Sequence, residues 1–234
     1  MPVPNKPSVH LISLLVFSIV LCGACQRFST RSTEKRPDLP RLESVVVMGF
    51  RDAVSERDEP RAARNPVTGG ALSAPPVSTE VVNKMTAKLF EGVRKVTNCE
   101  LISPGKARGV YSRLIASDPG RTQFEMLQQI GKTFSADAVL VGYLYRWTER
   151  VGGDLAADQP ASVAFDLSLI RSEDGAILWR EKFDKTQKSL SENLLEWNTF
   201  VRGRGRWMTA DKLAIFGLEG MLSRIPIGRD GENE

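Results

Sequence analysis

The stretch ADAVLVGYLYRWTERV, residues 136–151, decides the fold, because its apolar residues alternate over a length typical of a central β-strand. Side chains two positions apart point to the same face of a sheet. We therefore expect one face of this strand to carry Val139, Val141, Tyr143, Tyr145 and Trp147.

A second strand follows in residues 161–170 (ASVAFDLSLI), where the alternation is cleaner. Asp166 and its polar neighbours are expected on the outward face, and the inward face carries Val163, Phe165, Leu167 and Leu169. Asp174-Gly175 is a hairpin turn signal. It leads into a third strand, residues 176–183 (AILWREKF), so the second and third strands are expected to form a hairpin.

The preceding part of the chain predicts a parallel arrangement. Residues 44–50 (SVVVMGF) are rich in β-branched side chains and indicate a buried first strand. Residues 51–77, with prolines, paired glycines and mixed charge, predict a long loop. Apolar residues then recur at helical spacing over 78–96, with Ser78 as the N-cap. Residues 99–103 (CELIS) indicate a strand parallel to the first.

Three further helices complete the pattern. Ser103 and Pro104 suit the N-cap and first position of a short helix, residues 123–134 carry an amphipathic one, and a last helix covers about 209–223. Together these elements predict an α/β fold. It would have a single mixed β-sheet of about five strands with helices packed on it, formed by residues 42–226.

The N-terminus indicates a signal peptide. Residues 11–21 are apolar apart from two serines, a run too short to span a bilayer but suited to a signal-peptide core. The small residues Gly23 and Ala24 follow, and then Cys25. This order resembles the lipobox of bacterial lipoproteins, although Cys22 stands where leucine is usual. We therefore expect Cys25 to be lipidated; plain secretion and a redox pair of Cys22 and Cys25 are the alternatives.

Lipidation of Cys25 divides the chain into a removed signal peptide (1–24), a lipidated tether (25–41), the folded domain (42–226) and a polar tail (227–234). The tether is polar and interrupted by prolines, so it cannot bury enough apolar surface to fold alone. Gln26, where aspartate would retain a lipoprotein at the inner membrane, implies transport to the outer membrane. We expect a lipid-anchored protein of the cell outer membrane that faces the periplasm.

Processing at Cys25 also removes His10, the only histidine of the chain. The mature protein then lacks histidine, which excludes Ser-His-Asp and Cys-His catalysis and imidazole metal sites. It keeps one thiol, Cys99, at the start of a predicted strand, and we interpret it as a small buried hydrophobe. We predict no catalytic residue, no metal site and no cofactor.

Four short phrases resemble those of a known superfamily: VVVMGF (45–50), FSADAVLVGYL (134–144), VAFDLSLI (163–170) and DGAILW (174–179). The superfamily includes the TolB N-terminal domain, the curli-secretion-subunit proteins and the LpoB-type lipoprotein activators of peptidoglycan synthases. The resemblance implies a TolB N-terminal-like fold and a lipid-anchored, periplasm-facing protein that works by binding envelope partners.

The chain also departs from these groups. Curli pores insert strand pairs into the membrane, but the loop at 152–160 is too short for one and residues 51–77 are too rich in proline and glycine. LpoB-type activators have a long disordered tether. Here residues 26–41 extend to at most about 55 Å.

Three short motifs suggest chemistry, and each has a simpler interpretation. Ser103 and Lys106 match the S-x-x-K of penicillin-recognising enzymes, but a helix N-cap explains the serine. Residues 131–133 (GKT) resemble the end of a P-loop that lacks its first glycine. Asp154 and Asp158 can act as the paired carboxylates of a hydrolase, although acids in a Gly/Pro loop are more often solvated turn residues.

The best candidate for partner contact is the segment RGRGRW, with Arg202, Arg204, Arg206 and Trp207. Arginine and tryptophan are enriched among interface hot spots, and guanidinium groups pair with carboxylates or phosphates. Nucleic acid is not an expected partner, because the chain is exported. A solvated loop is the alternative interpretation.

These observations predict a non-catalytic adaptor or accessory factor of an envelope machine, attached to the membrane by its lipid and bound to an envelope protein. One alternative is a ring-forming secretion or assembly component, which would be a homo-oligomer. A carboxylate-based hydrolase is the other.

Overall fold

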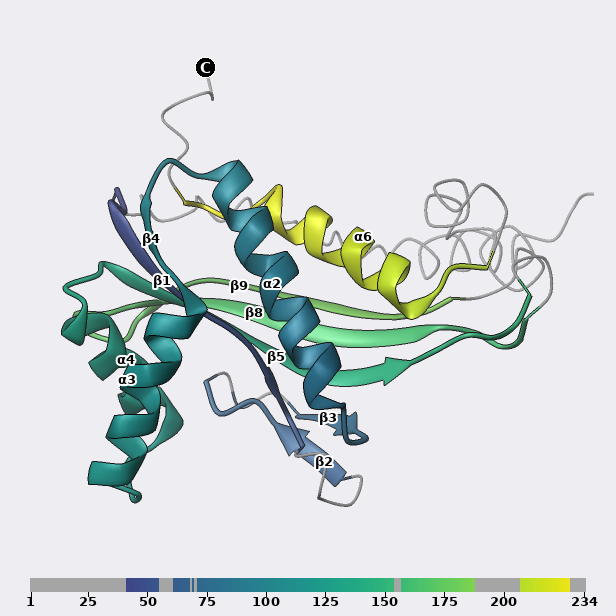
Figure 1. Cartoon of the computed structure of the whole chain (residues 1–234), viewed down its shortest axis with the longest axis horizontal. Helices are drawn as coiled ribbons and strands as arrows, with labels where there is room; N and C mark the ends of the chain where they lie inside the picture. The colour runs from purple at the N-terminus through teal and green to yellow at the C-terminus, as the bar shows by residue number, and fades with distance from the viewer. Residues whose placement is uncertain are drawn as a thin grey trace, which may run out of the picture. The chain divides into compact units, whose positions relative to one another are not determined.

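The centre of the fold is one mixed sheet of five strands: β1 (Ser44–Asp52), β4 (Glu100–Ile102), β5 (Ala138–Thr148), β8 (Ser162–Arg171) and β9 (Ile177–Thr186). Their order across the sheet is β4-β1-β5-β8-β9 (Figure 1). β1 is parallel to β4 and β5, whereas β8 is antiparallel to β5 and β9. The computed structural model describes residues 41–54, 61–67, 69, 71–153, 157–187 and 207–227, without the side chains of 61–64 and 71–74.

Among the described residues, four helices pack on this sheet, which confirms the predicted α/β class. α2 (Thr79–Val96) and α6 (Ala210–Leu222) lie side by side over one face (Figure 1). They bury the inward face of β8, including Phe165 and Leu167. α3 (Pro104–Ser117) and α4 (Gln123–Thr133) pack on the opposite face, against Val139 and Val141 of β5. Within the described ranges, no helix combines the length and the apolar character that crossing a membrane requires.

The helices begin where the sequence predicts, because polar side chains satisfy their first amide groups. Ser78 Oγ accepts from Val81 N at 3.4 Å at the start of α2. Thr122 and Glu125 form a reciprocal capping box at the start of α4. Ser103 occupies the predicted N-cap of α3, but its side chain makes no capping hydrogen bond.

Residues 51–77 hold more structure than the predicted loop. β1 continues to Asp52, and β2 (Arg61–Arg64) pairs with β3 (Ala71–Ala74) as an antiparallel hairpin. Asn65 shapes its turn, since its Oδ1 accepts from Val67 N at 2.7 Å and its carbonyl accepts from Gly69 N at 2.8 Å. These strands are short and their sequences do not alternate, so hydrophobic periodicity could not reveal them.

Trp147 lies on the other face from the one predicted. The β5–β8 register shifts between Leu144 and Arg146, which marks a β-bulge at Tyr145. Val139 and Tyr143 pack on the α3–α4 side, whereas Trp147 packs against the α2–α6 core. A bulge reverses the alternation beyond it, and no sequence signal indicated this one.

Candidate functional site

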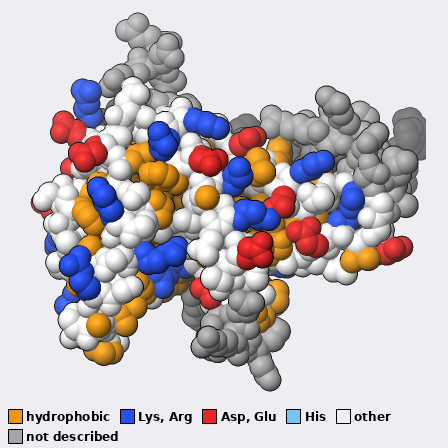
Figure 2. Space-filling model, in the orientation of Figure 1, with side chains coloured by type: hydrophobic (Ala, Val, Ile, Leu, Met, Phe, Trp, Pro, Cys, Tyr) orange, Lys and Arg blue, Asp and Glu red, His pale blue; other side chains and the backbone are white. Residues whose placement is uncertain are grey.

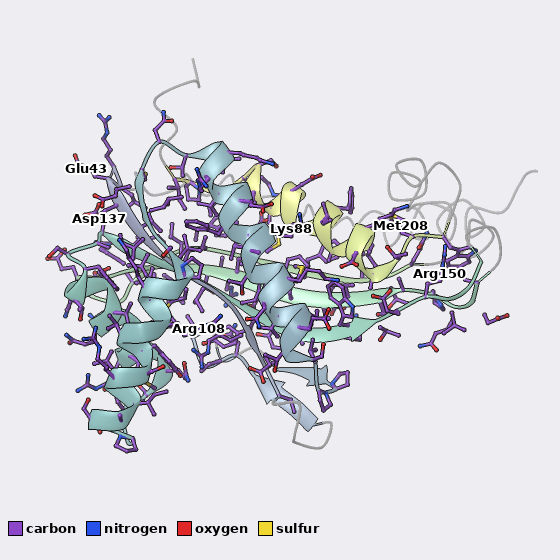
Figure 3. All side chains as sticks on the ribbon, in the orientation of Figure 1. Glu43, Lys88, Arg108, Asp137, Arg150 and Met208 are labelled. Carbon is purple, nitrogen blue, oxygen red and sulfur yellow. The ribbon has the colours of Figure 1, made fainter. Side chains whose placement is uncertain are left out.

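The two ends of β5 lie at opposite ends of the sheet, and each is joined to a neighbouring segment by hydrogen bonds. At the first end, the chain enters the fold through Glu43 and Ser44. Asp137 Oδ2 accepts from Glu43 N at 2.8 Å and from Ser44 N at 2.9 Å, and the Ser44 hydroxyl donates to it at 3.2 Å. These bonds fix the start of β1 to the start of β5, and Figure 3 shows Glu43 close to Asp137. We call this region the tether junction.

At the second end lie Trp207 and Met208, just before α6. The Trp207 carbonyl accepts from Arg150 Nη1, and Met208 N donates to Gln187 Oε1 at 2.7 Å. Glu149 Oε2 accepts from Ala210 N at 3.2 Å, so a carboxylate sits at the N-terminus of α6, where the helix dipole favours negative charge. Figure 3 shows Arg150 and Met208 at the end of the sheet away from Glu43. We call this region the far end.

Only one residue of the predicted partner segment can be placed. Trp207 is partly buried at the far end. Arg202, Arg204 and Arg206 lie outside the described residues, so their part in partner contact stays a prediction. Cys25 also lies outside them, and so its lipidation stays a prediction.

A buried polar cluster lies on the face of the sheet where α3 and α4 pack. Asp166 of β8 is only 6% exposed. Its Oδ2 accepts from Asn65 Nδ2 at 2.7 Å and from the Tyr145 hydroxyl at 2.8 Å. Asn65 thereby ties the turn of the β2–β3 hairpin to the sheet. The predicted face of Asp166 is correct, but its interpretation as an unremarkable outward residue is wrong.

Burial governs the chemistry of this cluster. It raises the pKa of Asp166, while the hydrogen bonds from Tyr145 and Asn65 pull that pKa down. Burial also raises the pKa of Tyr143 and of Tyr145 further above its ordinary value of 10. Asp166 Oδ1, the Tyr143 hydroxyl and the Ser168 hydroxyl have no hydrogen-bond partner among the residues that the structure describes. The bonds that are made hold the hairpin turn in place.

The other predicted residues are spread over the fold. Ser103 and Lys106 lie at the start of α3, with Lys106 exposed. Asp158 is exposed on β7 (Ala157–Gln159), which pairs with β6 (Val151–Gly152), and Asp154 lies outside the described residues. Cys99 is partly buried, and its thiol donates to the Leu42 carbonyl at 2.8 Å.

The face formed by α2 and α6 has a mixed surface. Figure 2 shows basic and acidic side chains interspersed across it. Lys84 of α2 pairs with Asp211 of α6 at 2.6 Å and lies 5.4 Å from the centre of the Trp147 ring. Exposed pairs of this kind contribute little stability, typically under about 1 kcal/mol. This face therefore shows no single charge sign that would select a partner.

Comparison with known proteins gives a loose structural likeness. No family model matches the sequence, and no curated protein matches it. The PelC dodecamer from Paraburkholderia phytofirmans is similar in structure, with a TM-score of 0.47 and 13% identity over 82% of this chain and 93% of that chain. Lipoprotein GNA1162 from Neisseria meningitidis gives a TM-score of 0.40 and 13% identity, over 68% of this chain and 91% of that one. The LpoB C-terminal domain from Escherichia coli gives a TM-score of 0.37 and 14% identity, over 64% of this chain and 87% of that one.

Proposed function

We propose that this protein is an outer-membrane-anchored periplasmic lipoprotein that serves an envelope machine as a non-catalytic adaptor or accessory factor. The anchor is the lipid on Cys25, because the sequence before it suits a signal peptide and lipobox. The partner is an envelope protein that contacts the segment from Arg202 to Trp207.

One observation carries this proposal. The tether junction and the far end lie at opposite ends of β5, whose 11 residues span about 35 Å at roughly 3.3 Å per residue. Anchoring through Cys25 therefore holds the domain by one end of its sheet and leaves the other end, with Trp207, available to a partner. This separation of attachment from contact is what an adaptor needs.

The anchor is tested by replacing Cys25 with alanine in cells and separating membranes from the soluble fraction. The Cys25→Ala protein should leave the membrane or accumulate with its leader uncleaved, because the acceptor thiol is gone. Cys22→Ala is the matched control and should be processed and anchored normally. A matured, membrane-bound Cys25→Ala protein would contradict the proposal.

The partner contact is tested by a photo-crosslinking amino acid at position 207, with position 132 as the comparison. Lys132 is exposed on α4 and contributes to a cavity beside the tether junction, so it reports on the other end of the sheet. We expect the same envelope protein to be captured repeatedly from position 207 and not from position 132. Equal capture from both positions, or none from position 207, would contradict the adaptor.

A ring-forming component is the second candidate, and the position of β9 favours it. β9 is one of the two edge strands of the five-stranded sheet and is 10 residues long, whereas the other, β4, has 3 residues. Edge strands can pair with another chain. An oligomer of fixed stoichiometry in mild detergent would support the ring, and a monomer would support the adaptor.

A further inference from the structure

β9 gives the sheet a long open edge. Among the described residues, no strand pairs with its outer side, and Figure 1 shows it as the outermost strand, beside α6. Gln187 N donates to the Ala161 carbonyl at 3.0 Å, and the pairing with β8 runs from there to Trp179 without a shift. Hydrogen-bonded and non-hydrogen-bonded pairs alternate in an antiparallel ladder, so the odd-numbered residues of β9 bond to β8. The backbone groups that point outward belong to four residues: Arg180, Lys182, Asp184 and Thr186.

The side chains along this edge are charged, and both signs occur on each face of the sheet. Lys182 and Asp184 are exposed on one face, whereas Glu181 and Lys185 lie on the other and are partly buried. Charges on an edge strand ordinarily oppose pairing with another chain. Whether they do so here depends on which residues lie opposite each other.

Two copies of β9 related by a two-fold axis would pair antiparallel, with one residue opposite itself at the axis. With Phe183 at the axis, Lys182 lies opposite Asp184 of the second copy. Glu181 then lies opposite Lys185 of the second copy, so opposite charges meet on both faces. An axis at any charged residue of the strand instead places that charge opposite itself, which destabilises the pair. Axes nearer the ends of β9 shorten the pairing, so the charge pattern selects the register centred on Phe183.

Contacts within the chain hold the two carboxylates of this edge in place. Arg146 pairs with Asp184, and Arg224 binds the two oxygens of Glu181 at 2.6 and 2.8 Å. A carboxylate has about four acceptor positions, so each can still accept from a lysine of a second copy. Lys182 Nζ lies 3.3 Å from Asp184 Oδ2 of its own strand, and this exposed pair can be exchanged for the same pair between copies.

The residue at the axis is aromatic and only partly buried. The Phe183 ring lies 5.2 Å from the ring of Phe165 and 6.5 Å from that of Phe216 on α6, measured between ring centres. Phe183 would occupy a non-hydrogen-bonded position between the two copies, where opposite side chains come closest. Aromatic pairs in such positions stabilise antiparallel strands. A second copy would therefore bury apolar surface at the middle of the edge.

We propose that two copies of this protein pair edge to edge through β9, antiparallel and centred on Phe183. The contact joins their two sheets into one continuous sheet. Because both copies use the same edge, the contact closes at two copies. A ring needs two different surfaces on each copy and would hold three or more copies. The pairing does not depend on the anchor at Cys25, and a dimer of this kind is compatible with the adaptor.

The number of copies is tested by sedimentation equilibrium of the mature protein in a neutral, density-matched detergent, at concentrations up to about 100 μM. We expect a dimer, or a monomer in equilibrium with a dimer. A monomer at every concentration would overturn the proposal. So would a species of three or more copies, which would favour the ring.

A charge reversal tests the role of the edge. Lys182→Glu should weaken the dimer about 10-fold or more, because two attractive pairs in each dimer become repulsive. Lys106→Glu is the matched control, with the same change of net charge at an exposed position on α3, and should leave the dissociation constant unchanged. Lys182 is exposed, so its variant should fold, which thermal unfolding checks. Equal effects of the two variants would overturn the assignment of the contact to β9.

Disulfide crosslinking tests the register itself. Position 181 would face position 185 of the second copy in a non-hydrogen-bonded pair, which is close enough for a disulfide. Within one chain these positions are about 13 Å apart, too far to be bridged. Oxidation of the double variant Glu181→Cys and Lys185→Cys, in a Cys99→Ser background, should therefore give a covalent dimer, whereas each single variant stays monomeric on a denaturing gel. No covalent dimer from the double variant, or equal amounts from the single variants, would overturn the proposed pairing.

Discussion

The buried environment of Asp166 is not apparent from the sequence around it. Alternation along β8 correctly gives the face it points to. Its buried carboxylate accepts a hydrogen bond from the amide of Asn65, 101 residues earlier in the chain. Nothing in the local sequence links these two residues. The buried state of this carboxyl was therefore visible only in the structure.

The raised pKa of Asp166 predicts how stability depends on pH. In the unfolded chain this carboxyl titrates near its ordinary pKa of 3.8, and burial raises the pKa in the folded state. Between these two values the folded protein binds the proton more tightly, so this residue's contribution to stability falls as pH rises through that window. Asp166→Asn removes the titration. The free energy of unfolding of the variant, relative to the parent, should therefore rise with pH in the window between 3.8 and the raised pKa, as urea titrations at several pH values would measure.

Asp184 provides a control of opposite sign. Burial alone would raise its pKa, but the hydrogen bonds and charges of Arg146 and Lys182 together outweigh burial and lower the pKa below 3.8. Its contribution to stability is present above 3.8 and is lost as pH falls through the lowered value. Asp184→Asn should therefore lose stability relative to the parent as pH rises from the lowered pKa to 3.8, and the difference should stay constant above that. If the stability of Asp166→Asn relative to the parent changed with pH in the same direction as that of Asp184→Asn, burial would not be the dominant influence on the pKa of Asp166.

Cys99 should be a protected structural thiol. It is partly buried and donates to the Leu42 carbonyl, so a reagent must disturb the start of the domain to reach it. We expect a thiol reagent to label the mature protein several times more slowly in buffer than in denaturant. With Cys25 processed and acylated as we propose, Cys99 is the only remaining thiol, so the signal needs no correction. Equally fast native labelling would indicate an exposed and reactive thiol.

Among the elements, β1 depends on a glycine for its shape. The β1–β5 register shifts between Val47 and Gly49, and Gly49 has a φ of +82°. A Cβ added to Gly49 would lie 2.3 Å from Thr86 Cγ2. Thr86 of α2 in turn accepts from Phe50 N at 2.9 Å, so the bulge joins the strand to the helix. Only glycine meets both the conformation and the close approach.

Gly49→Ala should therefore destabilise the domain by at least about 2 kcal/mol, combining left-handed strain with a clash. Gly69→Ala is the matched control, since Gly69 has a φ of +70° but no atom lies within 4 Å of the place a Cβ would take. Its loss should be nearer about 1 kcal/mol. Chemical denaturation measures both values. Equal losses of unfolding free energy in the two variants would mean that the clash between the new Cβ and Thr86 does not destabilise the domain.

The elements that the sequence predicted correctly are those with a local pattern of residues, either helical spacing or strand alternation. Ser78 and the apolar spacing after it gave α2, and alternation gave β8 with its inward Phe165 and Leu167. Trp147 was assigned to the wrong face because the bulge at Tyr145 is fixed by pairing with β8. The sequence does not reveal the β2–β3 hairpin, because backbone pairing and the turn at Asn65 define it. Neither feature produces a periodic pattern of hydrophobic residues.

At the scale of the whole molecule, the functional hypothesis depends on which end of the sheet each segment joins. Sequence suggested Cys25 for attachment and the segment from Arg202 to Trp207 for contact. It could not indicate that the sheet begins at Ser44, beside one end of β5, and that Met208 bonds to Gln187 near the opposite end. That relation follows from strand order and direction, which only the folded chain reveals. The cavity beside the tether junction was invisible for the same reason, because three distant segments build it.

The partner segment yields the most direct whole-molecule prediction. Replacing Arg202, Arg204 and Arg206 by glutamate should leave thermal stability nearly unchanged, since exposed charges are typically worth under about 1 kcal/mol each. Capture of the envelope partner should weaken, because the charge of the segment is reversed. The remaining binding should also depend less on salt, provided the arginines face an anionic surface. Pull-down from solubilised envelopes at two salt concentrations measures both effects.

The matched control for this prediction replaces Arg94, Arg108 and Arg113 by glutamate. These arginines are exposed on α2 and α3, so the change in net charge is the same but the far end is untouched. Loss of capture in the first variant alone assigns contact to the segment. Equal loss in both assigns it to net charge, and normal binding of the first variant makes the segment a linker. Unfolding of the first variant would mean that its arginines pair within the domain, and the hairpin region 51–77 would then be the next surface to test.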